Sequence, residues 1–222
     1  MSKGRLLVIE GLDGSGKATQ AKLLAAHLAE SGRRVMEITF PDYESDSSAL
    51  VKMYLSGQFG DKPDDVNPYA ASSFYAVDRY ASYKTKWGSF YEAGGIVIAD
   101  RYTTSNAVHQ CSKLPPEQWD DFLRWAFDYE YRLLGLPAPD AVFIGGSKGN
   151  MQAIVDAALA ANPQTRLCIA AIALETLQQS IAALAAHGLA AQVTQIAVSR
   201  SKAAGSLHLM MANNPVFLIV RE

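Results

Sequence analysis

The chain has 222 residues, of which 49% are hydrophobic and 19% charged, and its formal net charge at pH 7 is −2. This charge argues against nucleic acid or an anionic membrane as the main partner. Two cysteines, Cys111 and Cys168, do not suggest a disulfide framework. The N-terminus enters a strand pattern without an apolar signal region, and no apolar run approaches a membrane span. We therefore expect a soluble, cytoplasmic protein with one α/β domain or two small ones.

The stretch LLVIEGLDGSGKATQ, residues 6–20, predicts a strand, a glycine-rich turn and a helix in succession. The turn fits G-x-x-x-x-G-K, and this strand-to-helix context predicts a phosphate-binding loop, with an ordinary glycine-rich turn as the alternative. Glycines let successive backbone N–H groups face an anion, the helix N-terminus adds positive potential, and Lys17 can reach the outer phosphates. The residues of the predicted loop are Gly11, Leu12, Asp13, Gly14, Ser15, Gly16, Lys17, Ala18 and Thr19.

The position after the lysine departs from the usual pattern. A serine or threonine there would ligate magnesium through its hydroxyl, but this chain has Ala18. Thr19 follows, although its direction from the helix axis differs by about 100°. How magnesium is held is therefore open at this point.

A second strand is expected at 35–40, followed by a loop, a helix at 47–55 and a longer helix from Pro68 to about Tyr91. The longer helix carries an aromatic residue, Phe74, and the adjacent pair Asp78 and Arg79. Since Phe74 and Asp78 are four residues apart, an aromatic face and a cation can face one cleft. From spacing alone, however, we favour a core position for Phe74 and a pairing of Arg79 with Asp78.

A third strand, residues 95–100, is apolar throughout and ends in a carboxylate. In open α/β sheets the ligand crevice lies at the carboxyl ends of the strands, so we expect Asp100 and Arg101 to emerge beside the phosphate loop. Asp100 can hold Mg²⁺ directly or through water, and Arg101 can bind a phosphate with two hydrogen bonds. A helix beginning near Thr103 carries Ser105 and Gln110, and an aromatic amphipathic segment follows at 116–135.

Four motifs, EGLDGSGKATQ, FPDYES, FYAVDRY and DRYTTSNAVHQ, occur in an order and spacing that resemble thymidylate (dTMP) kinase over about residues 3–140. The resemblance implies a P-loop kinase core with ATP as co-substrate, Mg²⁺ as cofactor and a possible homodimer. It implies that residues 11–19 hold the ATP phosphates and that Ala18 is a tolerated variation. The implied catalytic residues are Lys17, Asp100 and Arg101.

The resemblance also implies a dTMP site, and it reverses the core interpretation of two residues. Phe74 would stack on thymine, Asp13 would meet the sugar hydroxyl, and Arg79 and Arg101 would contact the monophosphate or the base side. Gln110, with its neighbours, would help to read the base and exclude a ribose hydroxyl. The implied dTMP-binding residues are Asp13, Phe74, Arg79, Arg101, Tyr102, Ser105 and Gln110.

Beyond Asn150 the chain becomes Ala-rich, and after the strand expected at 140–144 it has neither the arginine-bearing lid nor the adenine segment expected of such a kinase. We expect strands at 140–144 and 166–171, helices at about 151–161 and 174–187, and two strands at 192–199 and 215–220. The last two strands form an antiparallel pair connected through Ser201–Leu209. Basic residues in this part that could replace a lid arginine are Lys148, Arg166, Arg200 and Lys202.

This second part resembles the second half of the decarboxylating precorrin methyltransferase of cobalamin biosynthesis. The similar stretches are PDAVFIGGSKGN, IALETL, QIAVSRSK and NPVFLIVRE. Because that family's own first half is missing, including the segments that hold S-adenosylmethionine, we do not expect methyl transfer. The methyltransferase-like loop consists of Gly145, Gly146, Ser147, Gly149 and Asn150.

The two resemblances predict a chimera, natural or engineered, of a kinase-like segment 1–139 and a methyltransferase-like segment 140–222. Both families have a largely parallel sheet between helices, and in both the fourth strand lies next to the first. We therefore expect one three-layer α/β sandwich with strand order 2-3-1-4-5-7-6 and an antiparallel strand 7. The expected function is phosphoryl transfer from ATP to dTMP, weakened by the missing lid. Non-catalytic nucleotide binding and S-adenosylmethionine-dependent methyl transfer are the alternatives.

Overall fold

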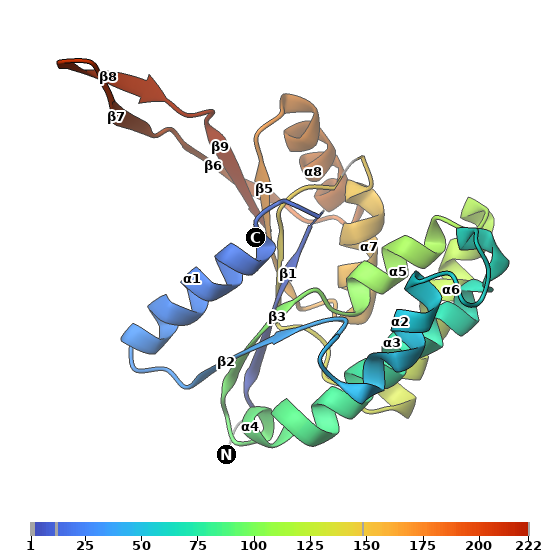
Figure 1. The fold of residues 1–222 in the computed structure, drawn as a ribbon. Coiled ribbons are helices and arrows are strands. Elements are labelled where there is room, and N and C mark those ends of the chain that lie inside the picture. Colours follow the sequence, from blue (N-terminus) through green and yellow to red (C-terminus); the bar gives the residue numbers. More distant parts are fainter. Residues whose placement is uncertain (1–2, 12, 148, 222) are drawn as a thin grey trace.

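The computed structural model describes residues 3–11, 13–147 and 149–221. Within these ranges the fold is built on a seven-stranded sheet with the order β2-β3-β1-β4-β5-β9-β6 and a separate two-stranded ribbon (Figure 1). The strands are β1 (Arg5–Glu10), β2 (Val35–Thr39), β3 (Ile96–Asp100), β4 (Ala141–Ile144), β5 (Arg166–Ala171), β6 (Ala191–Ile196), β7 (Ser199–Ala204), β8 (Leu207–Ala212) and β9 (Val216–Arg221).

The predicted strand order is confirmed. The last strand of the chain, β9, lies between β5 and β6 and runs antiparallel to both, whereas β1 to β5 run parallel to one another. Strand β1 pairs with β3 on one side, Leu7 opposite Ile98, and with β4 on the other, Leu7 opposite Ala141. The kinase-like and methyltransferase-like segments therefore share one continuous sheet.

Helices cover both faces of the sheet, as expected of an α/β sandwich. Helix α1 packs over Ile9 and Ile98, whereas α7 and α8 pack on the opposite face, over Val142 and Ile169. The α-helices are α1 (Lys17–Glu30), α2 (Ala49–Leu55), α3 (Pro68–Ser82), α4 (Gly88–Glu92), α5 (Thr103–Cys111), α6 (Trp119–Phe127), α7 (Met151–Ala161) and α8 (Leu174–Ala186). Short 3₁₀ turns are η1 (Asp46–Ser48), η2 (Pro63–Asp65) and η4 (Pro116–Gln118).

Two helices that the sequence predicts as continuous α-helices contain π-helical turns, η3 (Tyr83–Trp87) and η5 (Asp128–Leu133). A π-turn inserts one residue into the α-helical repeat, so the side chains that follow it face a different direction. Such turns are common at functional sites. One of them, η5, supplies Glu130, which pairs with Arg79.

The predicted antiparallel pair at the end of the chain, β6 and β9, is confirmed, and the stretch that connects them forms a ribbon that the sequence did not predict. Strands β7 and β8 pair antiparallel, with Ser199 opposite Ala212 and Ala204 opposite Leu207, and the ribbon projects away from the sheet (Figure 1). Every residue of both strands is exposed. Among the described residues, no helix is long and apolar enough to cross a membrane.

Candidate functional site

A cleft of about 550 Å³ lies beside the carboxyl ends of β1, β2 and β3. Residues that follow these three strands line it, namely Asp13 after β1, Phe40 after β2 and Arg101 after β3. This is where a parallel sheet places its ligand crevice. Helices α2, α3 and α5 also line it, through residues such as Tyr54, Tyr75 and Gln110.

The predicted phosphate loop joins β1 to α1 at one end of this cleft. Gly14 and Gly16 adopt φ values of 77° and 85°, in the left-handed region that glycine enters without strain. Gly11 is closely packed, since a Cβ atom there would lie 2.8 Å from the carbonyl oxygen of Gly145. Lys17 is the first residue of α1, and burial, with the positive charge of Arg101, lowers the pKa of its ammonium group. Leu12 lies outside the described residues, and Ser15, Ala18 and Thr19 are exposed.

The carboxylate of Asp13 accepts a hydrogen bond from the guanidinium of Arg101. The Asp13 side chain is 98% exposed, and the charge of Arg101 lowers its pKa. Arg101 has φ 68°, an uncommon conformation for a residue with a side chain, and its backbone N–H donates to Ile9. The structure therefore brings together two residues that the sequence separates by 88 positions.

Asp100, the last residue of β3, also lies at this end of the sheet. Its Oδ1 atom is buried and accepts no hydrogen bond from any residue that the structure describes. Burial raises the pKa of this carboxyl, although the nearby charges of Lys17 and Arg101 oppose that shift. A buried carboxylate oxygen without a donor is suited to bind a cation or its water. Asp100 thus fits the predicted magnesium role, and the described residues contain no cluster of three or more metal-ligating side chains.

Glu10, the last residue of β1, is a site residue that the sequence analysis missed. Its buried carboxylate accepts hydrogen bonds from the hydroxyls of Thr104 and Ser105 and from the backbone N–H of Tyr102 at 3.3 Å and of Ser105 at 3.2 Å. Burial raises its pKa, and these hydrogen bonds oppose the shift. Glu10 therefore fastens the start of α5 to the end of β1. The signal for this role in the sequence is the position of Glu10, a charged residue at the end of an apolar run.

Five aromatic residues line the cleft, namely Phe40, Tyr43, Tyr54, Tyr75 and Tyr102. The one from α3 is Tyr75, and the expected Phe74 is not among them. Phe74 packs against Tyr54 and Phe59, with ring centroids 6.4 and 5.5 Å away. Tyr75 is partly buried, and burial raises its pKa to about 12, which keeps the hydroxyl neutral at physiological pH. The next residue along α3, Tyr75, therefore lines the cleft, and the stacking role expected of Phe74 stays a prediction.

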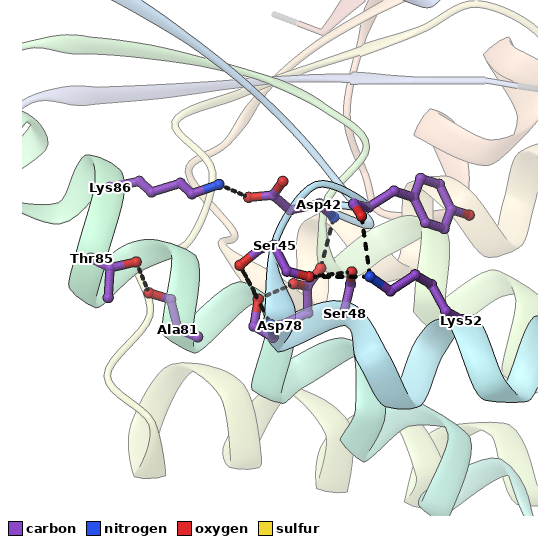
Figure 2. Close-up of polar contacts among 10 residues, drawn as sticks. Asp42, Ser45, Ser48, Lys52, Asp78, Ala81, Thr85 and Lys86 are labelled. Carbon is purple, nitrogen blue, oxygen red and sulfur yellow. Dashed lines mark hydrogen bonds and ion pairs between the residues drawn. The ribbon is translucent and has the colours of Figure 1, made fainter.

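Asp78 and Arg79 do not pair with each other, contrary to the interpretation from spacing. Asp78 accepts hydrogen bonds from the backbone N–H of Asp42 at 2.9 Å and from the hydroxyl of Ser47 at 2.6 Å (Figure 2). Lys86 in turn contacts the Asp42 carboxylate (Figure 2). Asp78 therefore fixes the loop after β2, whose residues Pro41 and Tyr43 line the cleft.

Arg79 instead forms an ion pair with Glu130, in which Nε and Nη2 donate to the two carboxylate oxygens at 2.6 Å each. Both side chains are at least 97% buried, with exposures of 1% and 3%. Burial disfavours the charged form of Arg79, but the negative charge and hydrogen bonds of Glu130 favour it. The pKa of Arg79 is therefore raised. No pattern in the sequence indicates this partner, which lies 51 residues further along the chain.

The polar residues expected at the base end come together on α5 and the turn before it. Tyr102, Ser105 and Gln110 all line the cleft. Gln110 is buried, and its Oε1 atom has no hydrogen-bond partner among the described residues; the same is true of Oδ1 of Asn106, another lining residue. Tyr102 is committed to the protein, since its hydroxyl donates to the carbonyl of Pro137 at 3.0 Å. Unsatisfied polar atoms in a cleft indicate a polar ligand.

The methyltransferase-like loop lies directly against the phosphate loop. The N–H of Gly145 donates to the carbonyl of Glu10 at 2.9 Å, and Ser147 is buried. Gly146 and Gly149 have φ values of 110° and 87°, and the N–H of Asn150 donates to Ser147 at 3.0 Å. The joined segment therefore completes one side of the phosphate loop.

None of the described basic residues of the second segment lines the cleft. Arg166 begins β5 and so lies at the opposite edge of the sheet, while Arg200 and Lys202 are on the projecting ribbon. Lys148 lies outside the described residues. Among the described residues, then, the second segment brings no arginine into the cleft.

A sequence model of the thymidylate kinase family matches residues 9–146, and a precorrin methyltransferase domain model matches residues 126–221. Thymidylate kinase of Mycobacterium tuberculosis (strain H37Rv) is 34% identical over 136 residues, which cover 61% of this chain and 62% of that protein. The chain thus spans about 62% of the length of such curated thymidylate kinases.

Two solved structures illustrate the two similarities. Thymidylate kinase from Candida albicans has 25% identity and a TM-score of 0.48, with 65% of this chain and 64% of that chain covered. Precorrin 8w decarboxylase from Methanobacterium thermoautotrophicum has 18% identity and a TM-score of 0.47, with 100% of this chain and 83% of that chain covered. Because the kinase model alone matches more than half of the chain, the protein belongs to the thymidylate kinase family.

Proposed function

We propose that the protein binds dTMP in the cleft and the phosphates of ATP at residues 11–19, and that it transfers a phosphoryl group from ATP to dTMP to give dTDP. The observation that supports this proposal is the contact of Asp13 with Arg101, which joins the glycine-rich turn after β1 to a cleft lined by Tyr75 and Gln110. Family membership supports the same function.

At the phosphate end, Lys17 and the loop N–H groups bind the ATP phosphates, and Arg101 binds the dTMP phosphate. Asp100 would hold Mg²⁺ directly or through water, since its buried oxygen lacks a donor among the described residues. Magnesium neutralises charge on the transferring phosphates. Ala18 supplies no hydroxyl for it, so Asp100 carries more of that role than in the usual loop.

At the base end, Tyr75 stacks on thymine in place of the expected Phe74. Gln110 and Asn106 offer buried amide groups whose oxygen atoms lack partners among the described residues. A base presents donors and acceptors at its edge, which such amides can bind. Asp13 remains the proposed contact for the sugar hydroxyl.

Turnover is proposed to be slow. In phosphoryl transfer a transition-state arginine contributes about 10³–10⁵ in rate, or roughly 4–7 kcal/mol of barrier. The described part of the second segment brings no arginine to the cleft. The same observation favours a second candidate, a non-catalytic nucleotide-binding protein.

The proposed chimera joins its segments near 139/140, inside the stretch 126–146 that both family models match. Small nucleotides are its proposed ligands. A homodimer and a cytoplasmic location are further predictions, which sedimentation and cell fractionation would test.

The test is an ADP-release assay with ATP, Mg²⁺ and dTMP, run beside calorimetric titrations with dTMP, dUMP, ATP and S-adenosylmethionine. ADP release that depends on dTMP supports the kinase. Micromolar dTMP binding without ADP release supports the non-catalytic candidate. Tight binding of S-adenosylmethionine, with none of dTMP, would contradict both.

A further inference from the structure

We infer that Glu130 is a positioning residue for the nucleotide: it holds the Arg79 guanidinium at the base end of the cleft and withholds it from the phosphate. The inference rests on the proposed function, because it concerns how the same cleft binds dTMP. It assigns different parts of the nucleotide to Arg79 and Arg101, for which the sequence resemblance implies the same possible contacts.

The contact is a two-bond fork that fixes both the position and the plane of the guanidinium. Nε and Nη2 donate to Oε2 and Oε1 of Glu130, each at 2.6 Å. Arg79 nevertheless lines the cleft. One edge of its guanidinium is therefore occupied by Glu130, and the orientation of the remaining edge toward a ligand is set before any ligand binds.

Stability alone does not explain this pair. Replacing a buried ion pair with apolar residues of similar size is often neutral or stabilising, whereas removing one partner is strongly destabilising. Pulling Arg79 away toward a phosphate would leave Glu130 charged and unpaired in a buried site. Arg79 is for this reason held in place, and Arg101, whose side chain is 19% exposed, is the arginine available to the phosphate.

The π-turn η5 carries Glu130 to this position. Within the same turn the pair of Asp128 and Arg132 lies on the surface, with side-chain exposures of 44% and 67%. Glu130 alone of these three charged residues is buried. The turn therefore presents one carboxylate to α3 and leaves the others in water, and the Asp128→Asn variant offers a matched control on the same turn.

The experiment compares the full-length wild type with Glu130→Gln by titrating thymidine, dTMP and ATP. The variant removes the charge while keeping the size of the side chain. We expect about tenfold weaker binding of both thymidine and dTMP, equivalent to about 1.4 kcal/mol. We expect unchanged ATP binding by Glu130→Gln and unchanged binding of all three ligands by Asp128→Asn. An equal loss for nucleoside and nucleotide identifies the base end as the place where Arg79 acts.

A folded Glu130→Gln protein with wild-type affinity for thymidine and dTMP would overturn the inference, and so would a loss confined to dTMP, which would place Arg79 at the phosphate. If Glu130→Gln does not fold, two further variants decide. Glu130→Asp should retain part of the thymidine affinity, and the double variant Arg79→Leu/Glu130→Leu should fold but lose it. Wild-type protein that binds no nucleotide would refute the proposed function, whereas binding unaffected in these variants would refute the inference alone.

Discussion

Arg101, the residue after β3, bonds through its guanidinium to the carboxylate of Asp13 in the phosphate loop. The contact links the loop proposed to bind the ATP phosphates to the segment before α5, a helix that lines the proposed dTMP cleft. A dTMP phosphate that enters the cleft offers Arg101 a dianion in place of one exposed carboxylate. Ligand binding is thus expected to exchange this ion pair for a stronger one.

The first prediction concerns Arg101→Ala. The variant should weaken dTMP binding by about 10- to 100-fold, since hydrogen bonds to charged groups contribute roughly 1.5–3 kcal/mol. Thymidine, which has no phosphate, should be much less affected. Calorimetry with the two ligands checks this expectation. Arg5→Ala is the control, because Arg5 lies at the amino end of β1, away from the cleft. Equal losses for thymidine and dTMP would argue against a phosphate role.

The second prediction concerns Lys17→Ala, which should weaken ATP binding by about tenfold or more and leave dTMP binding nearly unchanged. The reason is that Lys17 begins α1 beside the phosphate loop. Lys22→Ala, on the exposed side of the same helix, is the matched control. Titration of both ligands measures the effect, and parallel weakening of ATP and dTMP would count against the assigned role.

The third prediction separates Tyr75 from Phe74. Tyr75→Ala should weaken dTMP by roughly 1–3 kcal/mol, the scale of base stacking on an aromatic ring. Phe74→Ala should instead lower the free energy of unfolding, because Phe74 is not a lining residue and packs against Phe59 and against Tyr54 in the cleft wall. Denaturant unfolding and dTMP titration of both variants distinguish them. The reverse pattern would restore the original expectation for Phe74.

The fourth prediction concerns pH and Asp100. Burial raises the pKa of this carboxyl in the folded state, so the native protein binds that proton more tightly than the unfolded chain does. The free energy of unfolding therefore falls as pH rises from the unfolded pKa through the folded one. Asp100→Asn removes this dependence and should melt higher than wild type at pH 7 but not at pH 3, while losing magnesium-dependent ADP release. A lower melting temperature at pH 7 would contradict the burial argument.

The sequence predicted the sheet well because strong signals lie at each strand. Apolar runs bounded by glycine-rich turns placed the first five strands, and the resemblance of both segments to α/β families fixed their order. The ribbon was missed because the stretch from Ser199 to Ala212 shows no strict alternation of apolar and polar residues.

The site was less predictable, for reasons of geometry. Neighbouring residues on a helix point about 100° apart, so the resemblance selected Phe74 whereas Tyr75 is the residue of this pair that lines the cleft. The partner of Arg79 could not be found by spacing, since Glu130 comes from a π-turn that periodicity does not reveal. Glu10 was visible only as a charged residue at the end of an apolar strand.

The most direct test of the account is a calorimetric titration of the full-length protein with dTMP, followed by ATP with Mg²⁺ on the dTMP-saturated sample. The account predicts one dTMP per chain at micromolar affinity, abolished or strongly weakened in Arg101→Ala, and a separate ATP site that responds to Lys17→Ala. Absence of dTMP binding by a folded wild-type protein would contradict it.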